Sequence, residues 1–196
     1  RPGEGRHSGK SIDTFIVGDL IGRGAMGEVY RGRDRAGLPV AIKFLHPDLV
    51  ENDKKVKRFI REAEVAAKVE SDHVPRIFST GWLEDGKTPY LAMELLDGHD
   101  LGWHLRRTGR LEVGDVVELV EHVAKALADV RDAGVVHRDL KPANVFLTDT
   151  LPRTWKVLDF GLSKLSWSSG SLTKGNAVGT PSYMSPEQVR GPVVDH

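Results

Sequence analysis

The chain of 196 residues contains no cysteine, no excess of either charge and no long apolar run. The absence of cysteine excludes disulfides, zinc–thiolate sites and thiol nucleophiles, and it fits a reducing compartment. Basic and acidic residues balance at 28 each, so the chain lacks the positive field of a nucleic-acid-binding protein. No apolar run approaches the ~18 residues that a membrane helix needs, and no signal-peptide core is present. We therefore expect a soluble, cytoplasmic domain with no nucleic-acid partner.

The apolar pattern predicts a strand-rich first part and a helix-rich second part. Residues 1–11 are rich in glycine, arginine and serine, and this composition predicts a disordered lead-in. Runs of β-branched and aromatic residues predict strands over 15–17, 20–21, 40–45, 77–78 and 89–93. Apolar residues at helical spacing predict helices over 52–70, 101–108 and 112–133. The last of these is apolar around most of its circumference, which predicts a buried helix that ends at Gly134.

The most distinctive pattern is a polar loop between two short apolar strands. It reads HRDLKPAN at 137–144, and a second acid follows another apolar strand in LDFG at 158–161. Loops that are anchored at both ends often carry reactive side chains. Each motif alone is also compatible with an Asx turn at Asp139, capped by Asn144. Their occurrence together, in this order and spacing, favours a catalytic site.

These residues resemble the catalytic loop and the metal-binding Asp-Phe-Gly of protein kinases. The resemblance implies that Asp139 accepts the proton of a substrate hydroxyl. It also implies that Asn144 and Asp159 hold Mg²⁺, with Mn²⁺ as an alternative, beside bound ATP. Lys141 would steady the γ-phosphate, and a lysine at this place marks Ser/Thr kinases. The implied activity is that of a non-specific Ser/Thr protein kinase, and His137 is expected to be structural.

A glycine-rich stretch near the start of the chain fits the same family. Gly22, Gly24 and Gly27 are followed by Val29 in a strand, whereas a Rossmann turn would need a helix there. A plain flexible loop is the other alternative. The resemblance implies that the glycines let backbone N–H groups approach the ATP phosphates. The residues implied to surround the nucleotide are Ile21, Gly22, Gly24, Gly27, Val29, Ala41, Lys43, Met93, Glu94, Leu96 and Phe146, with Met93 as gatekeeper and the backbone of Glu94 and Leu96 on the adenine edge.

A lysine inside an apolar strand is a second anomaly of the first part. Lys43 could lie on an edge strand and extend to water, because lysines are seldom buried unless paired. Its context, VAIK, resembles the kinase lysine that binds the α- and β-phosphates. The partner carboxylate implied by the family is Glu62, which borders the apolar stripe of the helix over 52–70. Glu64 and Glu51 are the rival partners.

A Ser-, Thr- and Gly-rich stretch over 163–176 follows the second motif. It is typical of a plain linker, and its position before the SPE motif at 185–187 also resembles an activation loop. The resemblance makes residues 179–183 the floor under a substrate peptide. An arginine beside the catalytic acid suggests control by loop phosphorylation, since a phosphate could pair with its guanidinium. The candidate regulatory residues are Arg138, Thr173 as first choice of phosphosite, Ser171 as second, and Thr180, which is expected to serve the floor.

The resemblance implies an α+β, bilobal kinase fold. A five-stranded antiparallel N-lobe with one long helix would occupy 12–96, and a mainly helical C-lobe, incomplete at its C-terminus, would occupy 97–196. Bacterial Ser/Thr kinases of the eukaryotic type are the most similar group. The family's later helices have no counterpart here, so we expect the native protein to continue past His196, where a membrane anchor is left open. The 196-residue piece alone is expected to be unstable or nearly inactive.

Two rival functions remain from the sequence. A pseudokinase would be an ATP-binding scaffold or regulatory fragment, although Lys43, Asp139 and Asp159 are all present. A small-molecule phosphotransferase would keep the acids but generally lacks the GTxxY and Pro-Glu features found here. The partners implied by the kinase resemblance are proteins with acceptor serine or threonine, and self-association would allow autophosphorylation in trans.

Overall fold

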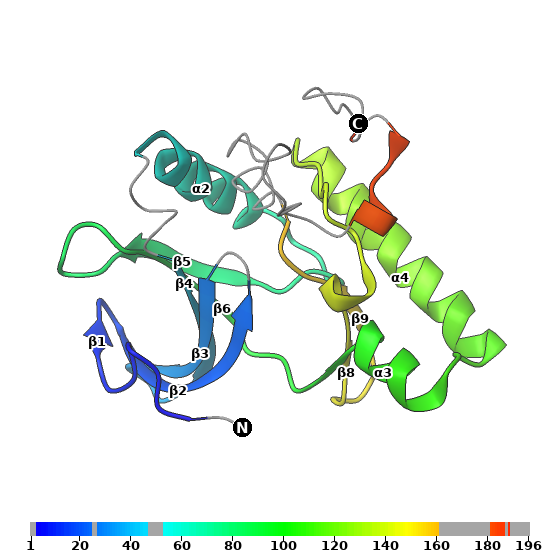
Figure 1. Cartoon of the computed structure of the whole chain (residues 1–196), viewed down its shortest axis with the longest axis horizontal. Helices are drawn as coiled ribbons and strands as arrows, with labels where there is room; N and C mark the ends of the chain where they lie inside the picture. Colours follow the sequence, from blue (N-terminus) through cyan, green and yellow to red (C-terminus); the bar gives the residue numbers. More distant parts are fainter. Residues whose placement is uncertain (1–2, 25–26, 47–52, 161–180, 187, 189–196) are drawn as a thin grey trace. The chain divides into compact units, whose positions relative to one another are not determined.

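The computed structural model describes residues 3–24, 27–46, 53–160, 181–186 and 188, without the side chains of 53–55, 58, 62 and 181. The chain divides into two compact units, one over 1–67 and 76–96 and the other over 68–75 and 97–196. Figure 1 shows the elements of both units, coloured along the sequence from blue at the N-terminus to red at the C-terminus.

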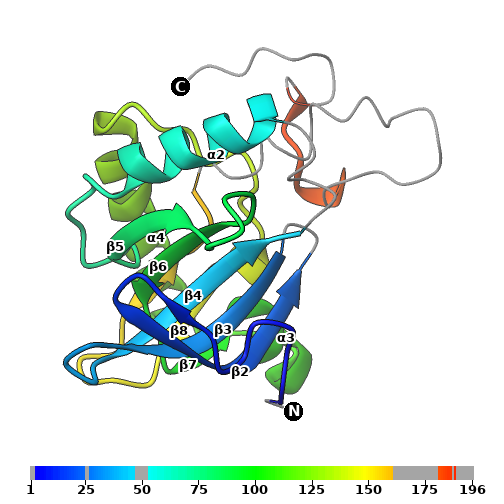
Figure 2. The same cartoon turned by 90° about the vertical axis from the view of Figure 1, so that its left-hand side faces the viewer.

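The first unit is an antiparallel sheet with one helix. Its strands are β1 (Ser11–Ile12), β2 (Phe15–Gly24), β3 (Gly27–Asp34), β4 (Pro39–Leu45), β5 (Ile77–Trp82) and β6 (Pro89–Glu94). They are ordered β1-β2-β3-β4-β6-β5. The expected five-stranded antiparallel sheet is confirmed, with the predicted runs 15–17 and 20–21 joined in the single strand β2, and the two-residue β1 adds a sixth strand at the edge. The helix α2 (Asp53–Ala66) packs along β5 and β6 (Figure 2).

The core of the sheet is aromatic, which explains why these strands form. Tyr30, Phe44 and Tyr90 are almost fully buried and make edge or tilted ring contacts. All but the first residue of β4 are buried, because this strand has neighbours on both sides. At the predicted hairpin turn, Asp85 Oδ1 accepts 2.8 Å hydrogen bonds from the N–H groups of Lys87 and Thr88. Such an Asx turn fixes the register of β5 against β6.

The prediction of a disordered lead-in over 1–11 is wrong for the described residues. Gly3 forms a bridge with Leu20, and β1 pairs with β2. His7 is only 6% exposed and stacks on the Phe44 ring. Composition misleads here because the segment has little apolar surface of its own. It obtains its order from contacts with residues that are distant in sequence.

The second unit contains two helices and a small sheet. Its elements are β7 (Gly98–Asp100), α3 (Leu101–Thr108), α4 (Val113–Asp132), η1 (Pro142–Asn144), β8 (Val145–Thr148), β9 (Trp155–Val157) and η2 (Pro181–Tyr183), with the sheet ordered β7-β8-β9. The predicted bounds of α3 are confirmed. Asp100 Oδ1 caps its start through Trp103 N at 2.8 Å, and Gly109, in the left-handed region, ends it.

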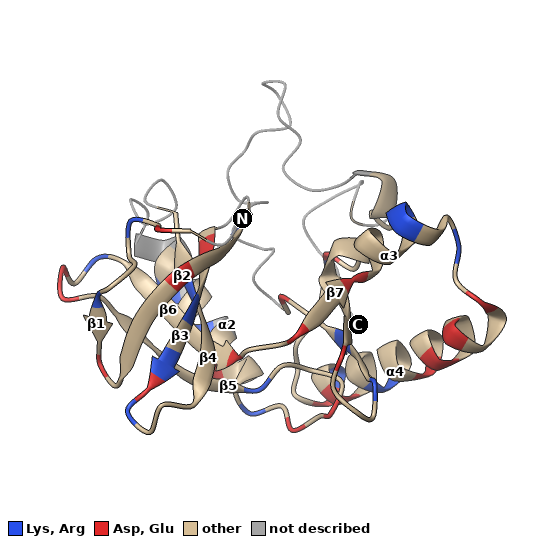
Figure 3. Cartoon of the chain, turned by 90° about the horizontal axis from the view of Figure 1, so that it is seen from below, with Lys and Arg blue, Asp and Glu red and all other residues tan. Residues whose placement is uncertain are grey.

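The helix α4 ends as predicted but is less buried than predicted. Its interior side packs on β9, and only Ala126 and Val130 are buried. Its N-terminal half, which carries acidic residues drawn red in Figure 3, also exposes four valines by 42–80%: Val113, Val116, Val117 and Val120. Within the described part of the chain, one face of an apolar helix therefore remains accessible to water.

The segment between α2 and β5 belongs to the second unit. The helix ends at Ala66, whereas the apolar pattern predicts an end at residue 70. Beyond it, Val157 N donates a 2.8 Å hydrogen bond to His73 O, and His73 Nδ1 lies 3.2 Å from Trp155 O. These contacts tie the segment that follows α2 to β9.

Candidate active site

The polar loop of the second unit is positioned by the end of α4 and the start of β8. Gly134, with φ 76°, forms a Schellman end in which Val135 N donates to Val130 O at 3.0 Å. The chain then runs extended into η1, and Val145 begins β8. Leu158 N donates a 2.8 Å hydrogen bond to Asn144 O, so the chain preceding Asp159 lies against the loop. The two motifs therefore meet in space.

Three of the predicted catalytic residues form one hydrogen-bonded group. Lys141 Nζ lies 2.7 Å from Asp139 Oδ2. Asn144 Nδ2 donates to the same carboxylate oxygen at 3.1 Å and to the main-chain oxygen of Asp139 at 2.8 Å. The side chains of Asp139 and Lys141 are 28% and 22% exposed, so both are partly accessible to a ligand. This arrangement fixes Asp139 as an oriented anionic acceptor beside a positive charge.

The buried His137 ring makes hydrogen bonds that stabilise the polar loop. Its Nδ1 accepts the N–H of Asp139 at 3.1 Å, and its Nε2 lies 2.8 Å from Leu158 O. One ring nitrogen must accept and the other must donate, which assigns the neutral Nε2–H tautomer. Burial lowers the pKa of His137, in keeping with a neutral ring. The ring also packs edge-on against Phe160, with centroids 4.8 Å apart. His137 therefore joins the two motifs by hydrogen bonds and packing.

Two residues of the site have backbone conformations that favour glycine. Arg138 has φ 64° and Asp159 has φ 59°. This region costs a residue with a side chain roughly 1–2 kcal/mol, and the surrounding bonds must hold it there. For Arg138, one such bond comes from Gln188, whose Nε2 donates to Arg138 O at 2.6 Å. Gln188 is buried, and its Oε1 accepts Ser185 N at 3.0 Å.

The donor set in the second unit fits a hard cation. The Asn144 amide nitrogen donates to two oxygen atoms of Asp139, and the Oδ1 atom, through which an amide ligates a metal, takes no part in these two bonds. Asp159 would supply carboxylate oxygens, and oxygen ligands are those preferred by Mg²⁺. Among the described residues, no group of three or more His, Cys, Asp or Glu could form a metal site. The metal site with Asn144 and Asp159 as ligands stays a prediction.

The glycine-rich hairpin of the first unit connects β2 to β3. Gly22 pairs with Val29, and Gly24 pairs with Gly27. A side chain at Gly27 would meet the carbonyl oxygen of Phe44, so this glycine is required by packing against β4. At Gly22 and Gly24 a Cβ would meet nothing closer than 3.9 Å. These two positions therefore have room for an approaching ligand.

Lys43 lies in the middle of the sheet. It pairs with Val29 of β3 and Leu91 of β6 and is 5% exposed. This position rules out the edge-strand alternative. Glu62 belongs to α2, but its side chain lies outside the described part of the structure. Its rival Glu64 is exposed, and Glu51 lies outside the described residues.

The other residues predicted to surround the nucleotide are described within their own units. Ala41 is buried in β4, Ile21 is exposed in β2, and Val29 is half-buried in β3. Met93 and Glu94 end β6, Leu96 follows it, and Phe146 is half-buried in β8. The N–H of Glu94 donates to Arg76 O at 2.8 Å, so Glu94 could offer an adenine only its carbonyl. Ser171, Thr173 and Thr180 lie outside the described residues.

Sequence reasoning missed the role of Gln188 in this site. In the sequence it is only the residue that follows the SPE motif, and a glutamine carries no signal of its own until its partner is known. Sequence reasoning also missed Glu28, whose buried carboxylate accepts a hydrogen bond from the Tyr30 hydroxyl at 2.7 Å. Its position directly after Gly27 was the one available clue.

Known proteins are similar to this chain in sequence and in fold. The family model for the protein kinase domain matches residues 15–196. The chain is 40% identical over 203 residues to the serine/threonine-protein kinase pkn3 of Myxococcus xanthus, covering 100% of the chain and 37% of that protein. It is 37% identical to PknB of Mycobacterium leprae, covering 93% of the chain and 30% of that protein. The chain thus spans about a third of the length of these relatives.

Crystal structures of a kinase domain also match the chain. A crystal structure of the Mycobacterium tuberculosis PknI kinase domain matches with a TM-score of 0.71 and 32% identity. That match covers 82% of the chain and 68% of the solved chain. A second crystal structure of the same kinase domain matches with a TM-score of 0.70 and 34% identity, covering 79% and 61%. By its sequence, its two-motif site and its fold, the chain belongs to the protein kinase family.

Proposed function

We propose that the protein transfers the γ-phosphoryl group of ATP to serine and threonine hydroxyls of proteins. The observation that carries this proposal is the group formed by Asp139, Lys141 and Asn144. It presents an oriented carboxylate with an ammonium 2.7 Å away. Relatives that are named serine/threonine-protein kinases support the same choice.

In the proposed reaction, Asp139 accepts the proton of the acceptor hydroxyl. The hydroxyl oxygen bonds to the γ-phosphorus while the bond from that phosphorus to the β–γ bridging oxygen breaks, releasing ADP. Lys141 offsets negative charge on the transferred group. Asn144 Oδ1 and the Asp159 carboxylate would hold the divalent cation, for which we propose Mg²⁺ with Mn²⁺ as a substitute. That cation neutralises the phosphate oxygens when bound.

In the first unit, Gly22, Gly24 and Lys43 are proposed to bind the phosphates. The carbonyl of Glu94 and the backbone of Leu96 would meet the adenine edge. Glu62 is the proposed partner of Lys43. Such chemistry depends mainly on positioning and electrostatics, which suits residues held by hydrogen bonds and strand pairing.

The finer parts of the proposal concern partners and control. We propose that the substrates are proteins, that the protein phosphorylates itself in trans, and that Thr173 or Ser171 is the site, with the phosphate paired to Arg138. No helix of the described residues is long and apolar enough to cross a bilayer. Catalysis on the cytoplasmic side is part of the proposal.

The test compares Asp139→Asn with the unchanged product of the whole gene. Mg·ATP affinity should stay within about twofold, while phosphate transfer to a generic acceptor or to itself should fall by roughly 10³-fold or more. Equal losses in binding and transfer would remove Asp139 from its assigned role. Transfer to casein but not to an aminoglycoside separates a protein kinase from a small-molecule phosphotransferase. ATP binding without any transfer by the unchanged protein would instead support the pseudokinase alternative.

A further inference from the structure

The segment before the family domain is tied to the glycine-rich hairpin. The family match begins at residue 15, yet residues 3–12 are folded onto the first unit. Gly3 and Leu20 exchange backbone hydrogen bonds of 3.4 and 2.9 Å, which attaches the segment to β2. His7 stacks on Phe44 with ring centroids 4.2 Å apart, which attaches it to the strand that carries Lys43. The segment therefore contacts both strands that carry the proposed phosphate-binding residues, β2 and β4.

Close packing around Tyr30 joins the segment to β3. A Cβ at Gly5 would lie 2.4 Å from the Tyr30 hydroxyl oxygen, so only glycine allows this approach. His7 N donates to the same hydroxyl at 3.4 Å. The hydroxyl in turn donates to Glu28 Oε2 at 2.7 Å. One side chain of the core thus links the segment to the residue that follows Gly27.

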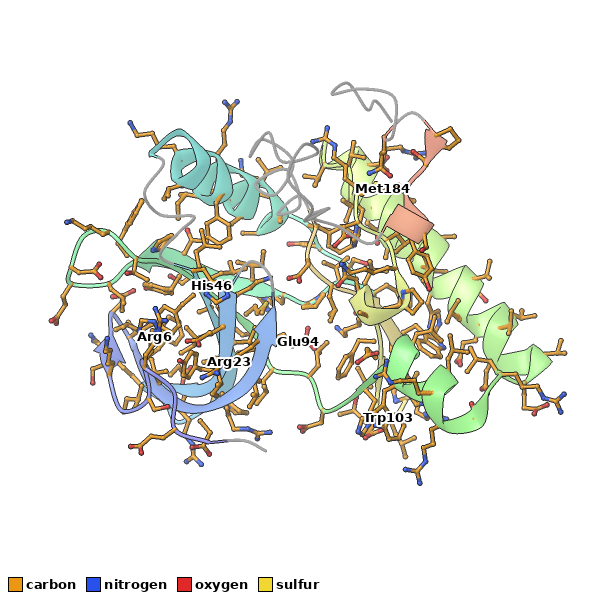
Figure 4. The ribbon with its side chains drawn as sticks, viewed as in Figure 1. Arg6, Arg23, His46, Glu94, Trp103 and Met184 are labelled. Carbon is orange, nitrogen blue, oxygen red and sulfur yellow. The ribbon has the colours of Figure 1, made fainter. Side chains whose placement is uncertain are left out.

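Glu28 is a buried carboxylate shared by two arginines. Arg23 Nε, across the hairpin, lies 3.2 Å from Oε1, and Arg6 Nε, from the N-terminal segment, lies 3.7 Å from Oε2. Burial alone would raise the pKa of Glu28, but the bond from Tyr30 and the charges of Arg6 and Arg23 lower it below its usual value. Figure 4 labels both arginines over the β2–β3 part of the sheet. Glu28 is therefore an anion held between the hairpin and the segment.

We propose that Arg6 is a positioning residue for ATP phosphate binding, acting through Glu28 to fix the glycine-rich hairpin. The inference rests on the proposed function, since it assumes that the hairpin meets the phosphates. Without Arg6, Glu28 keeps only one of its two arginines. The hairpin that carries Glu28 and Arg23 then loses its charged link to the N-terminal segment. Adenine binding should be spared, because its proposed contacts come from Glu94 and Leu96.

The experiment measures Kd for Mg·ATP and for adenosine by calorimetry on the product of the whole gene. Arg6→Ala should weaken Mg·ATP about three- to tenfold, as expected for a charge pair with one buried partner, and change adenosine less than about twofold. Arg6→Lys, which keeps the charge, should recover most of the loss. Arg33→Ala is the matched control, because Arg33 is an exposed arginine near the opposite end of β3. Lys43→Met shows how much affinity the phosphates contribute.

A second variant tests whether the effect of Arg6 on Mg·ATP binding passes through Glu28. Glu28→Gln should produce the same selective loss, and adding Arg6→Ala to it should have no further effect on Mg·ATP. Additive losses would overturn the proposed route through Glu28. Equal weakening of ATP and adenosine by Arg6→Ala, or no weakening of either, would also overturn the inference. If the unchanged protein binds Mg·ATP no better than adenosine, the proposed function itself fails instead.

Discussion

The side-chain amide of Gln188 donates a 2.6 Å hydrogen bond to the main-chain oxygen of Arg138, fifty positions earlier in the chain. Arg138 precedes Asp139 and has a left-handed backbone conformation. The bond therefore acts on the peptide that leads into the proposed catalytic acid. It connects that peptide to the segment that follows the proposed substrate floor. A change in one segment can thus alter the geometry of the other.

Gln188→Glu should reduce kcat about tenfold while leaving the Kd of Mg·ATP within about twofold, because a carboxylate of the same shape cannot donate to Arg138 O and would face it as an acceptor. Steady-state kinetics and calorimetry on the product of the whole gene test this. Gln188→Ala is the companion variant and should show a similar loss of kcat. An unchanged kcat in both would show that the bond is not needed for catalysis.

Gly27→Ala and Gly24→Ala should separate packing from ligand binding. At Gly27 the added Cβ would meet the carbonyl oxygen of Phe44, which must shift β3 away from β4. We expect the free energy of unfolding to fall by about 2 kcal/mol or more. At Gly24 the nearest atom would be 4.0 Å away, so stability should change by less than about 0.5 kcal/mol.

Urea unfolding of the two glycine variants and the unchanged protein tests this contrast. Mg·ATP affinity should fall for Gly24→Ala although its stability is retained. Similar losses of stability in both variants would contradict the packing difference between the two glycines.

Much of this organisation could be predicted, but not all of it. The bounds of α3 were predicted from apolar spacing, and the structure adds the caps Asp100 and Gly109. The end of α4 followed from Gly134. The order of residues 3–12 could not be predicted, because it depends on Tyr30 and Phe44, which lie beyond the reach of any local pattern. The exposed valines of α4 differ from the predicted burial because an apolar period indicates a face that can pack, not its partner.

The candidate site, too, could be predicted from the sequence only in part. The spacing of Asp139, Asn144 and Asp159 was visible in the sequence, since each belongs to a short motif. The hydrogen bonds that orient them are not coded by spacing. His137 and Gln188 act through main-chain oxygens, which no sequence pattern displays.

His7 should make the stability of the protein depend on pH. Burial, together with the positive charges of Lys10 and Arg6, lowers the pKa of His7 to about 4 from 6.5. In the unfolded chain the ring takes up its proton near pH 6.5, so between pH 6.5 and 4 the unfolded state binds more protons. Stability from a neutral His7 is therefore complete above pH 6.5 and is lost as the pH falls toward 4, by roughly 2 kcal/mol.

His7→Phe keeps the stacking on Phe44 but cannot take up a proton. Urea unfolding at about pH 7.5 and about pH 5 should show a smaller loss of stability for His7→Phe than for the unchanged protein. His99→Phe is a suitable control, because His99 is exposed and also stacks on an aromatic ring, that of Trp103. Identical pH dependence in the His7 variant and the unchanged protein would contradict the assignment.

Removal of the divalent cation should abolish phosphate transfer, and Asp159→Asn should shift the cation requirement. If Asp159 supplies a charged oxygen ligand, its amide variant will need at least about tenfold more Mg²⁺ for half-maximal transfer. The measurement is transfer to a generic acceptor during a Mg²⁺ titration after treatment with EDTA. Asp149→Asn, an exposed acid after β8, serves as the control and should follow the curve of the unchanged protein. A curve for Asp159→Asn that differs only in its plateau would show that the carboxylate acts in the transfer step and not in holding the cation.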